Sequence, residues 1–134
     1  MKKIKNKKGF TLLEILVALT ILSVGLLGLA SLQIVAVRSN SFSLQLSTAT
    51  ILAQQKLEEF KQTPYANIAS GSDTISSQTG TGAVATLGIT FNRQWTVSDN
   101  TPVADSKQVD VTVSWTGIDG KSHSVTLSSI YAKR

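Results

Sequence analysis

The chain has 134 residues and a formal net charge of +5, with 42 % hydrophobic and 16 % charged residues. This length accommodates one small domain and one membrane segment. The lack of cysteine excludes a disulfide scaffold, a thiolate metal site and a cysteine nucleophile, and a single histidine excludes a multi-histidine metal site.

The net positive charge of the chain comes from the first nine residues. Five lysines precede Gly9, at positions 2, 3, 5, 7 and 8, and no acidic residue precedes Glu14. Beyond Gly9, eight basic residues face eight acidic residues, so the rest of the chain is neutral. We therefore interpret the lysines as a topogenic signal, and no nucleic-acid partner is predicted.

A long apolar run follows the lysines. No charged side chain occurs from Ile15 through Val37, and a helix of about 20 apolar residues crosses a bilayer core. Because the positive charges precede the run, we expect a single-pass protein of the inner (cytoplasmic) membrane. Its N-terminus would lie in the cytoplasm and its C-terminal domain in the periplasm.

Two simpler membrane segments account less well for this region. A cleavable secretory signal has an apolar core of about 7–15 residues, which is shorter than this run, and rarely carries a carboxylate. A plain signal-anchor helix explains the length but neither Glu14 nor the Gly9–Phe10 junction.

Glu14 is the informative residue of the segment, because a carboxylate at a membrane helix is costly and marks a function. Cleavage between Gly9 and Phe10 would create an α-amine one helical turn from Glu14. The carboxylate would neutralise this amine or, in a filament, the amine of a neighbouring subunit. A buried charge pair of the latter kind sets the register between chains.

The residues Lys8-Gly9-Phe10-Thr11-Leu12-Leu13-Glu14 resemble the signature of type IV prepilins, which type II secretion pseudopilins share. The resemblance is close over about the first 40 residues and general beyond them. It implies that a membrane prepilin peptidase cleaves after Gly9 and methylates Phe10, giving N-methylphenylalanine. It also implies that Glu14 pairs with the amine of an adjacent subunit during assembly.

Residues 21–30, with the sequence ILSVGLLGLA, are similar to the minor pilin subgroup called PilV. This resemblance implies a non-catalytic filament subunit that takes part in type IV pilus assembly or initiation, and hence in adhesion or motility. The implied partners are the prepilin peptidase, other major and minor pilins, the inner-membrane assembly platform and the lipid bilayer, and the final location is the extracellular pilus. Many major pilins close a C-terminal loop with a disulfide, which this chain cannot form.

Two alternatives remain at this stage. A minor pseudopilin of the type II secretion system, similar to the GspI group, would share the first part of the segment but less of the Val-Gly-Leu-Leu-Gly phrase. A membrane-anchored periplasmic binding module would need no filament role and would keep an intact, unmethylated N-terminus.

The helix is expected to continue to Gln62, because residues 33–62 contain neither proline nor glycine and Thr63-Pro64 stops it. An unbroken helix from Phe10 to Gln62 would be about 80 Å long. Gly25 and Gly28 are predicted bending points, or a small-residue surface for neighbouring helices, together with Ala30. A predicted apolar stripe faces the domain, with Lys56, Glu58, Glu59 and Lys61 largely off it; its members are Leu46, Ala49, Ala53, Leu57 and Phe60.

The C-terminal half is predicted to be a loop and an antiparallel meander. Residues 66–88 are rich in Ser, Gly and Thr and indicate a loop with a short strand near residues 73–76. Apolar and polar residues alternate over 89–97, 109–115 and 125–131, with an Asp-Gly turn at 117–120. Arg93 interrupts one apolar face and is expected near an edge or in a pair. The helical stripe covers the sheet, which gives an α+β, pilin-like fold.

The predicted organisation is a leader (1–9), a transmembrane and assembly half of the helix (10–37), an amphipathic half (38–64), and a loop-and-sheet domain (65–134). No enzyme activity and no cofactor are predicted. His123 lies between two serines without a nucleophile elbow. Asp99, Asp105 and Asp119 lack the spacing of a calcium loop.

Overall fold

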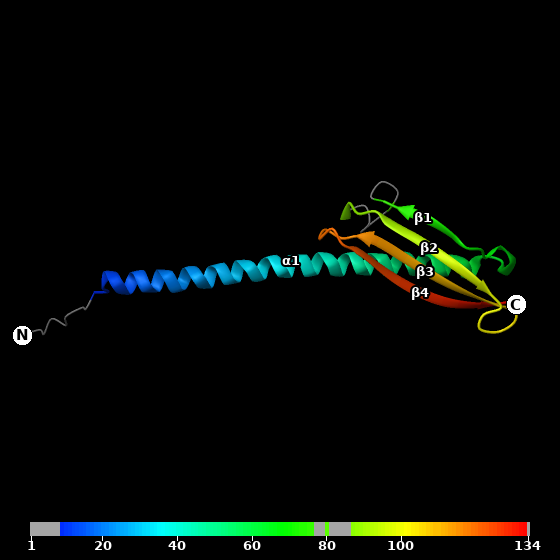
Figure 1. The fold of residues 1–134 in the computed structure, drawn as a ribbon, viewed down its shortest axis with the longest axis horizontal. Coiled ribbons are helices and arrows are strands. Elements are labelled where there is room, and N and C mark those ends of the chain that lie inside the picture. Colours follow the sequence, from blue (N-terminus) through cyan, green and yellow to red (C-terminus); the bar gives the residue numbers. More distant parts are fainter. Residues whose placement is uncertain (1–8, 77–79, 81–86, 134) are drawn as a thin grey trace, which may run out of the picture. The chain divides into compact units, whose positions relative to one another are not determined.

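A computed structural model describes residues 9–76, 80 and 87–133. It contains one long helix, α1 (Leu12–Gln62), a short 3-10 helix, η1 (Tyr65–Asn67), and four strands: β1 (Gly71–Ile75), β2 (Phe91–Asp99), β3 (Ser106–Thr116) and β4 (Ser122–Ala132) (Figure 1). The lysines of the predicted leader and residues 77–79 and 81–86 of the predicted loop lie outside the described residues. The chain divides into two compact units, with the boundary between Asn40 and Ser41.

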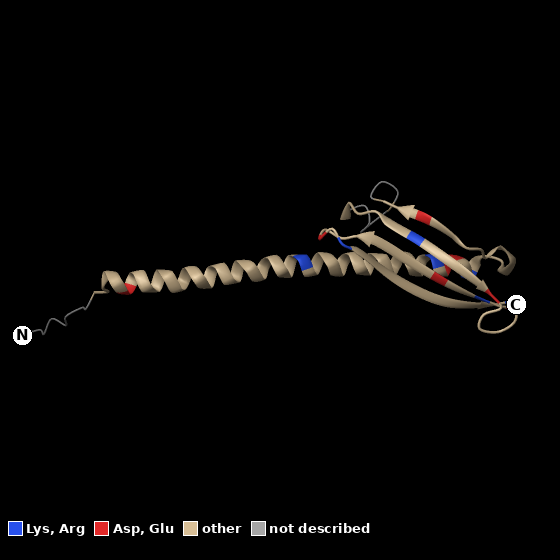
Figure 2. Ribbon diagram, in the orientation of Figure 1, with Lys and Arg blue, Asp and Glu red and all other residues tan. Residues whose placement is uncertain are grey.

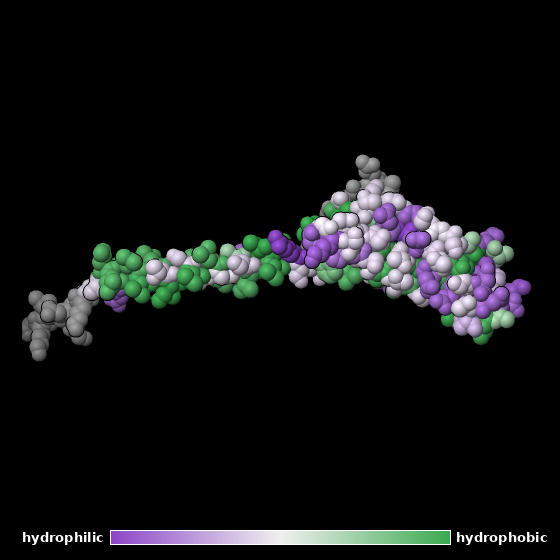
Figure 3. Space-filling view, viewed as in Figure 1, coloured by the Kyte–Doolittle hydropathy of each residue, from purple (hydrophilic) through white to green (hydrophobic). Residues whose placement is uncertain are grey.

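The described part of the first unit consists of residues 9–11 and the N-terminal half of α1. Between Gly9 and Asn40 the charged residues are Glu14 and Arg38 (Figure 2). Every side chain in this stretch is exposed, and Figure 3 shows its surface as almost entirely hydrophobic. An apolar helix with no buried face within its own chain needs lipid or other helices around it.

The second unit contains a four-stranded antiparallel sheet in the order β1-β2-β3-β4. The predicted meander is therefore confirmed, and β1 lies at 71–75 where a short strand was expected at 73–76. β3 and β4 pair without interruption from Ser106↔Ala132 to Thr116↔Ser122. The turn between them uses Gly120, whose φ of 74° favours glycine.

Residues of α1 after Asn40 cover one face of this sheet. Ala49 and Ala53 are completely buried, and Leu57 and Phe60 are nearly so. They pack against the alternate residues of the two central strands, namely Phe91, Val109, Val111, Val113 and Trp115. The predicted α+β arrangement, with the helix on an antiparallel sheet, is confirmed.

The predicted stripe on α1 was wrong at two positions. Leu46 is 39 % exposed, whereas Lys56, expected off the stripe, is 8 % exposed. The buried face also takes in Gln45, whose side-chain oxygen accepts a hydrogen bond from the Trp115 indole at 3.0 Å. The Lys56 ammonium lies 4.1 Å from the centre of the Trp95 ring and binds Glu59 at 2.8 Å. Partners from the sheet thus allow long polar side chains to occupy the buried face.

Arg93 joins three elements. It lies on β2, which is an inner strand, and not at an edge of the sheet. Of the two expected settings, the ion pair is the one observed. Its guanidinium donates to both carboxylate oxygens of Asp73 on β1 and to the Leu52 carbonyl of α1, the latter at 2.9 Å. This set of bonds satisfies a buried cation and attaches the short outer strand to the helix.

Candidate processing and assembly site

The start of α1 is set by Thr11. The Glu14 backbone N–H donates to the Thr11 hydroxyl at 3.2 Å, and the Ile15 N–H donates to the Thr11 carbonyl at 3.2 Å. These bonds make Thr11 the N-cap, so the helix begins at Leu12, two residues later than expected. The Thr-x-x-Glu spacing of a capping box was present in the sequence and would have revealed this role.

Gly9 and Phe10 therefore precede the helix. Both are exposed, Phe10 to 80 %, and a side chain at Gly9 would meet no atom within 4 Å. A protease reaches a peptide bond in an exposed, non-helical segment without first unwinding a helix. The Gly9–Phe10 bond has this accessibility.

Glu14 is the acidic residue in the first turn of α1, and its side chain is exposed. A carboxylate at this position interacts favourably with the positive end of the helix dipole. Among the residues that the structure describes, no cation forms an ion pair with it. The group is thus available to a cation from another source.

Hydroxyl groups in the apolar part of α1 bond to the helix's own backbone. The hydroxyls of Thr20, Ser23 and Ser31 donate to backbone carbonyls one turn earlier, at 2.7, 2.7 and 3.0 Å. In lipid such internal bonds are required, because no water is present to replace them. The helix is long and apolar enough to cross a membrane.

Gly25 and Gly28 lie within this continuous helix, and a side chain at either would meet nothing within 4 Å. No contact inside the described chain therefore requires glycine at these positions. Their predicted role in bending or in contact with neighbouring helices stays a prediction.

Comparison with known families agrees with this geometry. Residues 4–30 match the family described as the prokaryotic N-terminal methylation motif. The chain carries a prepilin-type methylation motif. Together with the apolar helix, this motif supports a place in the type IV pilin-like superfamily, indicates a structural subunit, and indicates anchoring in a membrane. No curated protein and no solved structure matches the chain.

The remaining candidate residues have local roles in the domain that contains the sheet. The His123 ring packs against Trp115 and Phe42, and its Nε2 lies 3.3 Å from an Asp119 oxygen. The backbone N–H of Lys121, and secondarily His123, holds the pKa of Asp119 below its usual value. Asp99 and Asp105 pair with Lys107 and Lys133. Across residues 9–76, 80 and 87–133, no three potential ligands are grouped to hold a metal.

Proposed function

We propose that this protein is a minor pilin of the PilV type, which is cleaved after Gly9, methylated at Phe10 and assembled into a type IV pilus. The observation that carries the proposal is the position of the matched motif. An accessible Gly9–Phe10 bond precedes a capped apolar helix with one carboxylate, Glu14, which has no ion-pair partner among the described residues. The partners would be the prepilin peptidase, the assembly platform of the inner membrane, and other pilins.

The chemistry of assembly is the pairing of charges in an apolar surrounding. Cleavage at Gly9 leaves an ammonium on Phe10, which sits poorly beside the positive end of its own helix dipole. A neighbouring Glu14 neutralises this charge when the helices leave lipid for one another. Because attraction between charges is strong where water is excluded, one such pair per contact sets the axial position of the subunits.

Two features favour a minor pilin of the pilus over other motif-bearing subunits. The phrase Val24-Gly25-Leu26-Leu27-Gly28 is the part most like PilV, and GspI-like pseudopilins share less of it. The absence of cysteine argues against a major subunit whose C-terminal loop is closed by a disulfide.

The first test is mass analysis of the N-terminus after co-expression with a prepilin peptidase. The mature chain is expected to begin at Phe10 and to carry one methyl group on its amine. A Gly9→Leu variant, which changes only the residue before the bond, should stay uncleaved. Parent protein that still begins at Met1 in cells with active peptidase would refute the proposal.

The second test separates processing from assembly. A Glu14→Ala chain should be cleaved and methylated like the parent but should be absent from sheared filaments, because an incoming ammonium would find no carboxylate. Glu58→Ala is the matched control, since Glu58 is an exposed acid on the same helix beyond the apolar half. Normal recovery of the Glu14→Ala chain in filaments would contradict the assigned role.

A further inference from the structure

The outer edge of β4 differs from that of an ordinary protected sheet. β4 is the last strand of the sheet, and among the described strands none pairs with its outer side. Its 11 residues include no lysine, arginine, aspartate, glutamate, proline or glycine, and its register with β3 is unbroken, so no bulge turns it away. Proteins ordinarily protect such an edge with one of these devices.

The ladder shows which backbone groups are free. Lys133 N–H donates to the Asp105 carbonyl, and Gly117 N–H donates to the Lys121 carbonyl, both at 2.8 Å. Both pairs continue the β3–β4 register, in which bonded and non-bonded residue pairs alternate. The odd-numbered residues of β4 therefore bond to β3. The N–H and C=O groups of Ser124, Thr126, Ser128 and Ile130 point toward the open edge.

The two rows of side chains on β4 have different chemistry. The outer row is exposed; it bears hydroxyls at Ser124, Thr126 and Ser128 and an aliphatic side chain at Ile130. The row on the helix side, which includes Val125, Leu127 and Tyr131, is only half-buried. A segment laid along the edge would thus meet hydroxyls on one face and apolar groups on the other.

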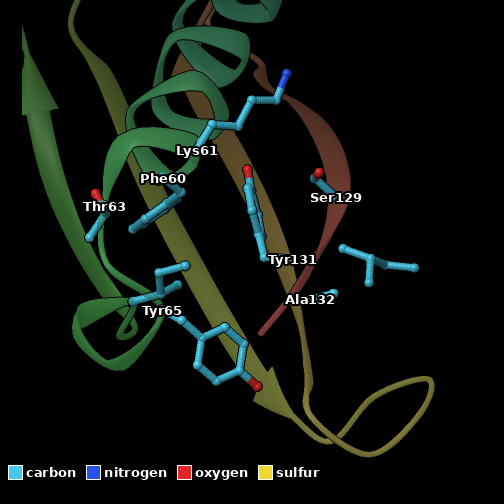
Figure 4. A pocket seen from close by; sticks show the side chains of 9 residues that line it. Phe60, Lys61, Thr63, Tyr65, Ser129, Tyr131 and Ala132 are labelled. Atoms are coloured by element: carbon cyan, nitrogen blue, oxygen red, sulfur yellow. The ribbon is translucent and has the colours of Figure 1, made fainter. Parts of the chain in front are cut away.

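A pocket of about 490 Å³ lies at the C-terminal end of this edge, between β4, the end of α1 and η1. Its lining includes Phe60, Tyr65 and Ile68, with Ile130 and Tyr131 from β4 itself. Figure 4 shows the Phe60, Tyr65 and Tyr131 rings around this space, with Lys61 pointing away above them. The rings and Ile68 would contact a large apolar side chain, while Lys61, Thr63 and Ser129 make the rest of the lining polar.

From these observations we infer that β4 binds an extended segment of another protein chain by strand addition. The segment is uncharged where it pairs with residues 124–130, and it alternates hydroxyl and aliphatic side chains. The segment runs antiparallel to β4, as all neighbouring strands of the sheet do, and a large apolar residue at its N-terminal end enters the pocket beside Tyr131. Backbone bonds supply affinity, and the alternation and the pocket supply specificity.

A second copy of this chain fits the edge poorly. The other outer strand, β1, has only five residues, and its Asp73 lies in the helix-side row. β4 runs in the same direction as residues 41–62 of α1, because Phe42 contacts His123 and Leu57 contacts Tyr131. If two β4 edges paired in the antiparallel sense, the helices of the two domains would therefore point in opposite directions. Subunits that are inserted in one membrane with the same topology have helices that point in the same direction. This argument against a second copy rests on the proposed function.

Two variants at one position test the inference on the full chain in detergent micelles. Ser128→Pro removes an N–H that points outward, which an edge strand tolerates, whereas Ser128→Ala keeps it. The probe is a fluorescent synthetic peptide, acetyl-Phe-Thr-Val-Thr-Leu-Thr-Val-Thr-amide, with a peptide of the same composition in clustered order as control. Binding is followed by anisotropy, and amide hydrogen exchange is measured with and without the probe.

The probe should protect the amides of residues 124, 126, 128 and 130 in the parent and in Ser128→Ala. Ser128→Pro should lose about tenfold in affinity, because a bond is lost and the ring obstructs its neighbour. Circular dichroism of both variants should match the parent. Equal binding of the two variants, no protection of these amides, or equal binding of the clustered peptide would overturn the inference.

A third variant, Thr126→Cys, examines the alternative occupant, since the parent has no cysteine. Efficient disulfide-linked dimers of this chain in membranes would show that a second copy fills the edge, and would overturn the choice of another protein. These results are independent of N-terminal cleavage. A chain that begins at Met1 would refute the pilin proposal while leaving strand addition to be decided by the peptide.

Discussion

At the scale of single residues, the domain is held together by polar side chains that reach across the layers. Gln45 of α1 and Trp115 of β3 are 70 positions apart and are joined by a buried hydrogen bond. Removal of one partner would leave the other buried and unsatisfied, at a cost of about 1–3 kcal/mol. Such bonds fix which face of the helix meets the sheet, a choice that apolar contacts alone leave loose.

Tyr131 provides a similar bond at the other end of the helix. Its hydroxyl donates to the Leu57 carbonyl at 2.6 Å. Partial burial, the largest influence, raises its pKa above the ordinary value of 10.0. The folded state therefore favours the neutral phenol more than the unfolded state does. This contribution is complete below pH 10.0 and is lost as the pH rises through the higher pKa of the folded state.

We expect Tyr131→Phe to lower the free energy of unfolding at pH 7 by about 1 kcal/mol, because the hydrogen bond is lost. The difference between variant and parent should shrink above pH 10, where the parent phenol ionises and loses the same bond. Denaturant unfolding at a series of pH values measures both effects. If the difference in the free energy of unfolding stays constant through the alkaline range, the Tyr131 hydroxyl proton does not contribute to stability.

At the scale of elements, the small residues of α1 determine how closely it approaches the sheet. Ala49 and Ala53 have no exposed surface, and they face the central strands that carry Val109, Val111 and Val113. A tightly packed interior resists added volume as well as lost volume. The contact between helix and sheet is therefore sensitive to enlargement at these two positions.

Ala53→Leu is expected to destabilise the domain by about 1–3 kcal/mol, because three more carbon atoms must displace the sheet. The adjacent Gln54→Leu is the matched control: its side chain is exposed, so we expect a change within about 0.5 kcal/mol. Thermal unfolding followed by tryptophan fluorescence distinguishes the two variants. Similar melting temperatures would mean that the helix is free to move away from the sheet.

Much of this element structure could be predicted from local sequence. Alternation of apolar and polar residues located β2, β3 and β4, and Thr63-Pro64 located the end of α1. The buried face of α1 was less predictable, because the burial of Lys56 depends on Trp95, which lies far away in the chain. The N-cap role of Thr11 was missed for a different reason. The Thr-x-x-Glu spacing was present in the sequence, but these residues were interpreted only as part of the cleavage and methylation motif.

The candidate site shows the same division. The accessibility of Gly9 and Phe10, and the lack of an ion-pair partner for Glu14 within residues 9–76, 80 and 87–133, could be learned only from the structure. Their proposed roles came from a resemblance over a short segment. The open edge of β4 could not be predicted from sequence, since the order of strands decides which of them lies outermost.

At the scale of the whole molecule, charge and hydrophobicity are separated along the chain. The lysines lie at its start, the apolar residues occupy the first half of α1, and residues 41–134 carry seven basic and seven acidic residues. A domain with no net charge neither steers partners electrostatically over long distances nor repels its own copies. Its binding must depend on short-range contacts such as backbone pairing.

A fragment of residues 41–134 is expected to fold without the membrane segment, because the buried core lies entirely within this unit. It should be a monomer that needs no detergent, since the exposed apolar residues of the first half of α1 are absent. With its balanced charge, it should be least soluble near neutral pH and more soluble at pH 4, where protonated carboxylates leave it positive. Circular dichroism and ultracentrifugation test folding and mass, and a solubility series tests the charge effect. A fragment that unfolds or aggregates at every pH would show that the domain depends on residues before Ser41.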